Sequence, residues 1–281
     1  MSRTQTKISR SLIALTIFAV GSWLGCGSSK STERFELTGS STVAPIMQKV
    51  VAELERDNKG VRFEVQTGGS SRGATDTIED RNDVGMMSRD PTKDELSKLY
   101  AHPIAFDGIS LIVNKGNPIT SIKHAQVVEL FTKKTTKWSG VSKHKGDVFV
   151  ISKAEGRATL DVFLKHFDLT AQKVKPDAVI GDNQQGLRMV AGNPQAIGFV
   201  SVGEALRAVK DGVKIKLVAL DGVSPTTSNI ADGSYPLSRR LYLVFREQPK
   251  EGWGRVILDF VASDRGKAIV KDLNFVPLAA K

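Results

Sequence analysis

Short runs of β-branched and aromatic residues alternate with helical patterns along most of this 281-residue chain. Strands are predicted at residues 34–38, 61–66, 83–87, 109–114, 148–152, 197–202 and 215–220. Helices are predicted at residues 45–57, 74–80, 160–167, 184–191 and 202–210. Strands that alternate with helices in this way are typical of α/β layers with largely parallel sheets. The alternation therefore predicts an α/β fold.

The last third of the chain departs from this alternation. Residues 235–245 contain a second strongly apolar strand, and residues 253–270 return to a helical pattern. The two apolar strands, within 109–114 and 241–245, are the natural crossings between two lobes. We therefore expect one lobe at residues 33–111 plus 241–281 and another at residues 112–240. Clefts between domains and the carboxyl ends of strands favour ligand binding, so the chemistry is expected in the loops that follow strands.

The N-terminal segment has the pattern of a secretory leader. Arg3, Lys7 and Arg10 precede an apolar run at residues 12–24, with no acidic residue between them. A membrane-spanning helix needs roughly 20 apolar residues, and this run is shorter. Residues 1–25 are therefore predicted to be a signal peptide.

The single cysteine, Cys26, follows Gly25 and lies two residues past that apolar run. Its position resembles the bacterial lipobox, in which the cysteine is lipidated, although Trp23 and Leu24 depart from the preferred residues of that motif. We expect residues 26–32 to form a lipidated tether, which places the protein outside the cytoplasm, periplasmic or on the cell surface, anchored to the membrane. The alternative is a free cysteine beside an ordinary cleavage site.

The charge balance argues for small anions rather than for nucleic acid. The leader contains three of the 40 basic residues and none of the 30 acidic ones, so the charge without it is +7. The basic residues are scattered, and no aromatic-rich basic stripe accompanies them. A moderately positive surface attracts anions.

Three loops place small hydroxyl residues at the start of a helix. They are residues 39–45 (GSSTVAP), 67–73 (TGGSSRG) and 155–159 (EGRAT). A helix N-terminus offers free N–H donors and the positive end of the helix dipole, which together favour an anion. Ser and Thr are also ordinary helix caps, so a single loop of this kind does not establish a binding site.

Seven segments occur in the order seen in phosphate-binding lipoproteins of bacterial phosphate ABC transporters: TGSSTVAPIM, GGSSRG, DVGMMSRD, EGRAT, NPQAIGFVSVG, YPLSRRLYLV and NFVPL. The chain resembles that family from about residue 35 to its end. The resemblance implies a two-lobed periplasmic-binding-protein type II fold with a central cleft and a two-strand hinge. It also implies a monomer that captures inorganic phosphate and delivers it to the permease subunits of the importer, with no catalytic activity, cofactor or metal.

The resemblance implies that the following residues bind the ligand: Ser41, Thr42, Val43 through its backbone N–H, Ser70, Ser71, Ser88 and Thr159. Ser88 stands where some family members have an aspartate. The candidates for a carboxylate that could accept the proton of monohydrogen phosphate are then Asp90, Glu155 and Asp161. Asp90 is more simply explained as a surface residue.

The third loop departs further from the family pattern. Lys153 and Arg157 stand where an arginine and a serine are usual. We expect Arg157 to take over the role of the arginine, because a guanidinium grips an oxyanion with two parallel hydrogen bonds. Arg89 is expected to brace a loop through a carboxylate, although direct ligand contact stays open, as it does for Lys153. The cluster at residues 182–184 is explained by helix capping.

The sequence leaves two other functions open. Residues 69–73 match the G-x-S-x-G pattern of acyl hydrolases, in which Ser71 would be the nucleophile with a later acid and histidine. His124, His144 and His166 lie late enough, yet none lies in a recognisable catalytic loop, and no metal-binding spacing occurs. The second alternative is a binding protein for another oxyanion: sulfate, molybdate or tungstate.

Overall fold

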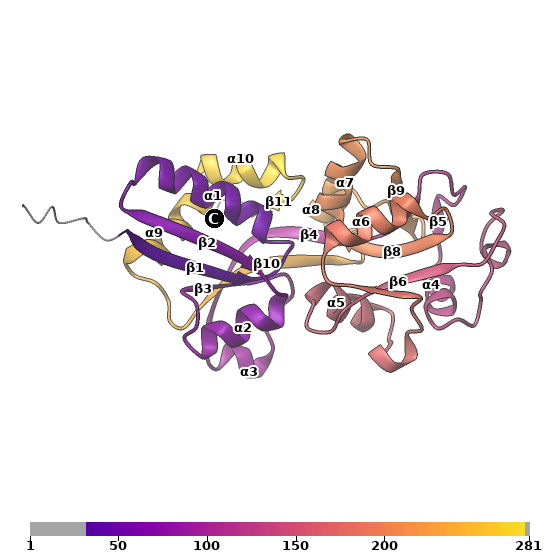
Figure 1. The fold of residues 1–281 in the computed structure, drawn as a ribbon, viewed down its shortest axis with the longest axis horizontal. Coiled ribbons are helices and arrows are strands. Elements are labelled where there is room, and N and C mark those ends of the chain that lie inside the picture. The colour runs from indigo at the N-terminus through magenta and orange to yellow at the C-terminus, as the bar shows by residue number, and fades with distance from the viewer. Residues whose placement is uncertain (1–31, 279–281) are drawn as a thin grey trace, which may run out of the picture. The chain divides into compact units, whose positions relative to one another are not determined.

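The computed structural model describes residues 32–278, so the predicted signal peptide and Cys26 lie outside the described residues. The main elements, shown in Figure 1, run in the following order: β1 (Glu33–Gly39), α1 (Ala44–Asp57), β2 (Val61–Thr67), α2 (Ser70–Ile78), β3 (Val84–Met87), α3 (Lys93–Leu96), β4 (Tyr100–Asn114), β5 (Ser121–Ile122), α4 (His124–Phe131), β6 (Phe149–Lys153), α5 (Ala158–His166), β7 (Ala178–Ile180), α6 (Asn183–Gly192), β8 (Ala196–Ser201), α7 (Val202–Lys210), β9 (Ile215–Leu220), α8 (Thr227–Ala231), β10 (Ser238–Phe245), α9 (Gly252–Ala262), α10 (Asp264–Asp272) and β11 (Val276–Pro277). The predicted α/β fold is confirmed.

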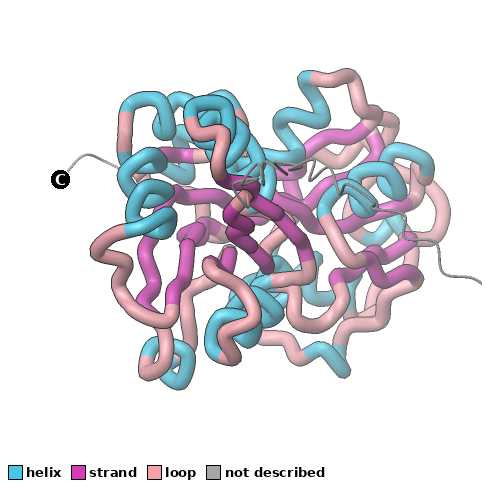
Figure 2. Tube along the Cα trace, turned by 60° about the vertical axis from the view of Figure 1, so that its left-hand side comes forward, coloured by secondary structure: helices cyan, strands magenta, loops and turns pink. Residues whose placement is uncertain are grey.

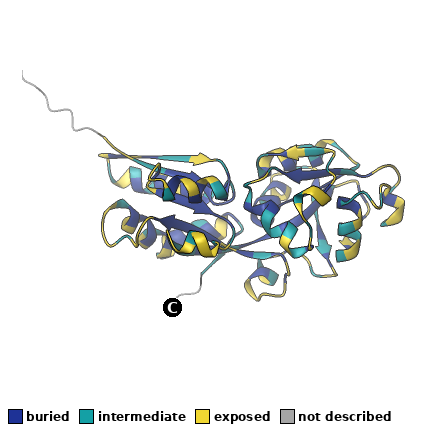
Figure 3. Ribbon diagram, turned by 90° about the horizontal axis from the view of Figure 1, so that it is seen from below, coloured by how far each residue is buried: buried dark blue, intermediate teal, exposed yellow. Residues whose placement is uncertain are grey.

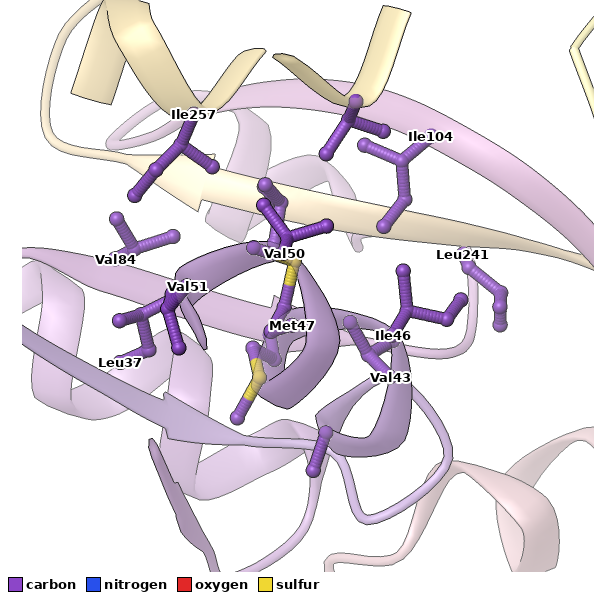
Figure 4. Packing of buried hydrophobic residues seen from close by; sticks show 14 of the residues in the cluster. Leu37, Val43, Ile46, Met47, Val50, Val51, Val84, Ile104, Leu241 and Ile257 are labelled. Carbon is purple, nitrogen blue, oxygen red and sulfur yellow. The ribbon is translucent and has the colours of Figure 1, made fainter. Parts of the chain in front are cut away.

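The first lobe is built on the strand order β2-β1-β3-β10-β4. Helices α1, α9 and α10 cover one face of this sheet, and α2 covers the other. The apolar side chains of α1 recur along one side of the helix, and Figure 4 shows them packed among residues of the strands and of α9. Burial of this face stabilises the helix, since most helical stability in proteins comes from such packing.

The second lobe has its own core on both faces of strands β6, β8 and β9. Helices α6 and α7 pack on one face, and α4 and α5 pack on the other. Phe163 of α5 stacks on Phe199 of β8 with ring centroids 4.0 Å apart. Figure 3 shows buried residues concentrated along the strands, with the exposed residues on the outer surfaces of the helices.

Strands β4 and β10 run through both lobes (Figure 1) and pair antiparallel. Figure 2 shows strands in the middle of the molecule with helices around them. In β4 the buried side chains belong to the first core up to Ala105 and to the second core from Ile109. In β10 the same change falls between Leu237, just before the strand, and Leu241. These two crossing strands make the sheet mixed, which corrects the expectation of largely parallel sheets.

Most predicted boundaries agree with the structure to within two residues, but three predicted elements differ more. Helix α2 begins at Ser70 rather than at residue 74, so the serines of that loop occupy its first turn. Strand β4 begins at Tyr100 rather than at residue 109. The predicted helix at 253–270 is two helices, because the hydroxyl of Ser263 accepts the Gly266 N–H and starts α10 after a break. No helix between residues 32 and 278 combines the length and apolarity that crossing a bilayer requires.

Candidate functional site

The loop between β1 and α1 is held by the side chain of Ser40. Its hydroxyl oxygen accepts the N–H of Thr42 at 3.2 Å and the N–H of Val43 at 3.4 Å. Ser40 therefore caps the turn that leads into α1, where Pro45 fits because the first turn needs no N–H from it. Thr42 is buried by this arrangement, whereas Ser41 is half-buried and faces a solvent-filled groove.

Ser70 follows β2 and Ser88 follows β3, the two strands that flank β1, and the two residues contact each other. The Ser70 hydroxyl accepts the backbone N–H of Ser88 at 3.0 Å. The Ser88 hydroxyl in turn accepts the O–H of Ser40 at 2.9 Å. Both serines are almost fully buried, so the carboxyl ends of β1, β2 and β3 bring three hydroxyl-bearing loops together. This is the edge at which open α/β sheets bind ligands.

Arg239 of β10 lies at the centre of these loops, although sequence reasoning did not select it. Its guanidinium donates to the Thr42 hydroxyl at 3.2 Å, to the Thr159 hydroxyl at 3.0 Å and to the Ser88 carbonyl oxygen at 3.3 Å. Thr42 and Ser88 belong to the first lobe and Thr159 begins α5 of the second. A single buried cation therefore joins side chains of both lobes.

Asp107 of β4 balances the charge of Arg239. One carboxylate oxygen accepts two guanidinium N–H groups, at 2.8 and 3.1 Å, and the exposed fractions of the two side chains are 2% and 0%. The other oxygen accepts the Ser201 O–H and the Gly203 N–H. This carboxylate is fully satisfied, as a buried charge must be.

Four hydroxyl groups of the cluster have a hydrogen available to donate. Thr42, Ser70, Ser88 and Thr159 each accept a hydrogen bond from a protein N–H or O–H. A hydroxyl has one hydrogen besides its acceptor lone pairs. Within residues 32–278 none of these four hydrogens is directed to a protein acceptor, so all four are left to donate to a bound group. Hydroxyl donors from both lobes around a guanidinium suit an oxyanion.

A second buried cation, Lys153, lies at the end of β6. Its ammonium donates to the amide oxygen of Asn183 at 2.8 Å, and Asn183 donates to the hydroxyl of Thr42 at 3.2 Å and to the carboxylate of Glu204. Burial lowers the pKa of Lys153 to about 7, and burial raises the pKa of Glu204. Asp182 caps α6 as expected, by accepting the N–H of Gln185, whereas Asn183 reaches across to the first lobe.

Two cavities lie next to the cluster or to the residues that contact it. One, of about 520 Å³, is lined by Ser41, Asn183 and Glu204, among others. Another, of about 510 Å³, is lined by Arg239 together with Arg89 and residues of α5. The cluster is thus buried but lies close to both cavities.

The remaining predicted residues lie at the edge of this cluster. The N–H of Ser71 donates to the Gly156 carbonyl of the second lobe at 3.3 Å. The side chain of Arg157 is half-buried, passes over Gly69 and ends beside Gly181. Ser41 and Val43 lie in the loop that Ser40 holds. That each of the eight predicted residues contacts a ligand stays a prediction.

None of the three carboxylates considered as proton acceptors lies in the cluster. Asp90 is exposed and accepts the Tyr242 O–H, and Glu155 is exposed on its loop. Asp161 pairs with Arg89 at 3.2 Å. Arg89 also pairs with Glu95 at 2.7 Å, so it braces a loop through carboxylates as expected. The buried carboxyl groups beside the cluster are instead Asp107 and Glu204.

The geometry does not favour a hydrolase. His124 contacts the carbonyl of His166, and His144 packs against Trp138, so these three histidines are engaged away from Ser71. In the described part of the chain, no group of three or more His, Cys, Asp or Glu side chains is arranged to hold a metal ion.

Arg239 and Asp107 had a signal in the sequence that reasoning about loops passed over. Side chains alternate between the two faces of a strand. Arg239 therefore shares a face with Leu241 and Leu243, both fully buried, whereas Arg240 falls on the other face and is exposed. A charged residue on the buried face of a central strand requires a buried partner, which is Asp107.

The chain matches the profile of the PBP superfamily domain over residues 27–265. It is 30% identical to the phosphate-binding protein PstS of Staphylococcus saprophyticus, over 95% of this chain and 88% of that protein. A structure of a phosphate ABC transporter substrate-binding protein from Clostridium perfringens, with bound phosphate, superposes with a TM-score of 0.81 at 27% identity. That comparison covers 88% of this chain and all of the other.

A second solved structure, an ABC-type phosphate transport receptor from Vibrio cholerae, has a TM-score of 0.72 at 25% identity. The comparison covers 87% of this chain and all of that one. Both structures share the two-lobed α/β fold described above.

Proposed function

This chain belongs to the PBP superfamily, and we propose that it captures inorganic phosphate outside the cytoplasm and delivers it to the permease subunits of an ABC importer. The observation that carries this proposal is the buried Arg239, whose guanidinium donates to the hydroxyls of Thr42, Ser88 and Thr159, with the Ser70 hydroxyl bonded to the Ser88 N–H beside them. The family is one of substrate-binding proteins, so binding rather than catalysis is the expected activity.

The proposed mechanism replaces the water shell of the anion with protein donors. Thr42, Ser70 and Ser88 would approach a tetrahedral oxyanion from the first lobe, and Thr159 would approach it from the second. The guanidinium of Arg239 would supply the positive charge, since hydrogen bonds to ionised groups are stronger than neutral ones. Ligand-driven closure of two lobes requires tighter binding to the closed state, and donors from both lobes provide that difference.

The full set of ligand-binding groups that we propose adds Arg239 to the residues predicted from the sequence. It comprises Ser41, Thr42, Val43, Ser70, Ser71, Ser88, Arg157, Thr159 and Arg239. Arg157 is the least central of these, because its guanidinium lies beside Gly181.

We also propose the boundaries of the two lobes and the mode of membrane anchoring. The lobes comprise residues 33–111 plus 241–281 and residues 112–240, joined by β4 and β10. Export follows the signal peptide at residues 1–25, and lipidation of Cys26 tethers the protein to the membrane. Tethering would keep captured phosphate near the permease.

Titration calorimetry of the purified protein with phosphate and with sulfate, from about pH 5 to 8, tests the proposal. We expect heat with phosphate and a loss of affinity of roughly tenfold or more in Thr159→Val, because the variant lacks one donor. Thr75→Val, at an exposed position of α2, is the control that should bind as the wild type does. Heat with sulfate but none with phosphate would indicate another oxyanion, and heat with neither would exclude the oxyanion class.

A further inference from the structure

Lys153 is a buried cation whose hydrogen-bonding capacity is mostly unused. The residue is 4% exposed, and its ammonium group has three N–H donors. Among residues 32–278, the amide oxygen of Asn183 is its single hydrogen-bond acceptor. A fully protonated ammonium in this position is therefore undersolvated, which disfavours the charged form.

Asn183 links this cation directly to the proposed anion site. The same side chain that accepts from Lys153 donates to the Thr42 hydroxyl, and thereby leaves the hydrogen of Thr42 to a bound ligand. Lys153 is thus separated from a ligand-binding hydroxyl by one amide group. An anion held by Thr42 would be near enough to change the electrostatic energy of the ammonium group.

The charged groups that face Lys153 come from four elements. Glu204 of α7 and Asp182 at the start of α6 favour its protonated form, whereas Arg239 of β10 and Arg157 before α5 oppose it. Burial exceeds the effect of the two carboxyl groups and places the pKa of Lys153 near 7. The carboxyl group of Glu204 is itself buried, and this burial raises its pKa.

We propose that Lys153 is the titrating cation of the anion site and takes up a proton when phosphate binds. This inference rests on the proposed function. An added negative charge favours the protonated form of a nearby lysine. Above about pH 7 the free protein holds Lys153 largely neutral, so binding has to recruit a proton and the affinity falls by up to about tenfold per pH unit. Below that pH the proton is already present and the affinity loses this dependence.

Proton uptake is measured by phosphate calorimetry in two buffers with different ionisation enthalpies. The matched control is Lys153→Arg, because a guanidinium keeps its charge throughout the accessible range and the ionisation of phosphate itself contributes equally to both proteins. At about pH 8 we expect the wild type to bind as many as about one proton more than Lys153→Arg does when phosphate binds. At about pH 5 we expect the two proteins to bind the same number of protons. Glu204→Gln should keep most of the excess seen in the wild type.

Equal proton counts in the wild type and Lys153→Arg would overturn the inference while leaving phosphate binding intact. An excess that survives in Lys153→Arg but disappears in Glu204→Gln would assign the proton to Glu204 and would also overturn it. If Lys153→Arg does not fold, NMR titration of the Lys153 side chain in the wild type decides instead: its pKa must rise when phosphate is added. Absence of any phosphate heat in the wild type would refute the proposed function itself.

Discussion

Asp107→Asn isolates the charge balance at the centre of the site. The substitution keeps the shape of the side chain and its acceptor for Ser201 and Gly203, but it removes the negative charge beside Arg239. The exposed fractions of the two side chains, 2% and 0%, mean that water cannot take over this role. Breaking a buried pair on one side costs about 3–5 kcal/mol, because an uncompensated charge stays buried. We expect the free energy of unfolding to fall by that amount.

Urea unfolding followed by circular dichroism measures this loss, with Asp161→Asn as the matched control. Asp161 also pairs with an arginine, but its side chain is 42% exposed and Arg89 keeps Glu95 as a second partner. An exposed pair contributes about 0–1 kcal/mol, so the control should lose no more than that. Similar losses in the two variants would show that Asp107 does not compensate a buried charge.

Adding phosphate to the same experiment tests whether the ligand reaches Arg239. A ligand that binds only the folded protein adds about 2.7 kcal/mol at 100 times its dissociation constant. In Asp107→Asn the bound anion also supplies the missing negative charge. Phosphate should therefore stabilise this variant more than it stabilises the wild type at the same concentration. Equal or smaller stabilisation would place the anion away from Arg239 and refute the proposed site.

Three further outcomes are expected. Gly69→Ala should weaken phosphate binding at least about tenfold in calorimetry, because Gly69 has φ +102° and an added Cβ would lie 2.5 Å from the Gly156 carbonyl oxygen of the other lobe. The control Gly192→Ala has open space at its Cβ and should bind as the wild type does; equal affinities of the two variants would contradict a close contact between Gly69 and Gly156. Thr42→Ser should retain phosphate binding while Thr42→Val loses about 1–3 kcal/mol of it, since only the first keeps the hydroxyl; equal loss in both would deny the hydroxyl a role. Without phosphate, the free energy of unfolding of the wild type in urea should increase as the pH rises from about 7 toward 10.5, because the lowered pKa of Lys153 means that the unfolded chain binds more protons than the folded one in this range. Lys153→Met should abolish that increase, and the same pH profile in both proteins would contradict the lowered pKa.

Local sequence patterns were sufficient for most of the fold and for the hydroxyl-bearing loops. Strands such as β1 and β8 carry their signal in β-branched and aromatic residues within a few positions of each other. The loop at residues 39–45 is recognisable because Ser and Thr between a strand and a helix have a local physical role. The late start predicted for β4 has a local cause as well. Pro103 has no N–H for the ladder, and the pairing with β10 shifts between Leu241 and Tyr242, opposite this proline.

The charged centre of the site could not be found in this way, because its contacts join distant parts of the chain. Arg239 and Asp107 are 132 residues apart and become neighbours only through the antiparallel register of β10 on β4. Asn183 reaches Thr42 across 141 residues. Alternation along β10 places Arg239 on a buried face, but nothing in the surrounding sequence identifies Asp107 as its partner or distinguishes Asn183 from an ordinary helix-start asparagine. Their roles follow from strand pairing and lobe contact, which local periodicity does not specify.

Arg239 lies on a strand that crosses between the lobes, and its position is therefore more fixed than that of an arginine on a loop. A guanidinium on β10 is held by Asp107 on β4, so the cation stays fixed in the hinge while hydroxyl groups from both lobes approach it. Preorganised donors do not have to be ordered when the anion binds, which reduces the entropic cost of binding. The guanidinium of Arg157 instead lies beside Gly181 at the edge of the cluster, and within residues 32–278 no carboxylate pairs with it as Asp107 pairs with Arg239. We therefore expect Arg239 to contribute more to the phosphate affinity than Arg157 does.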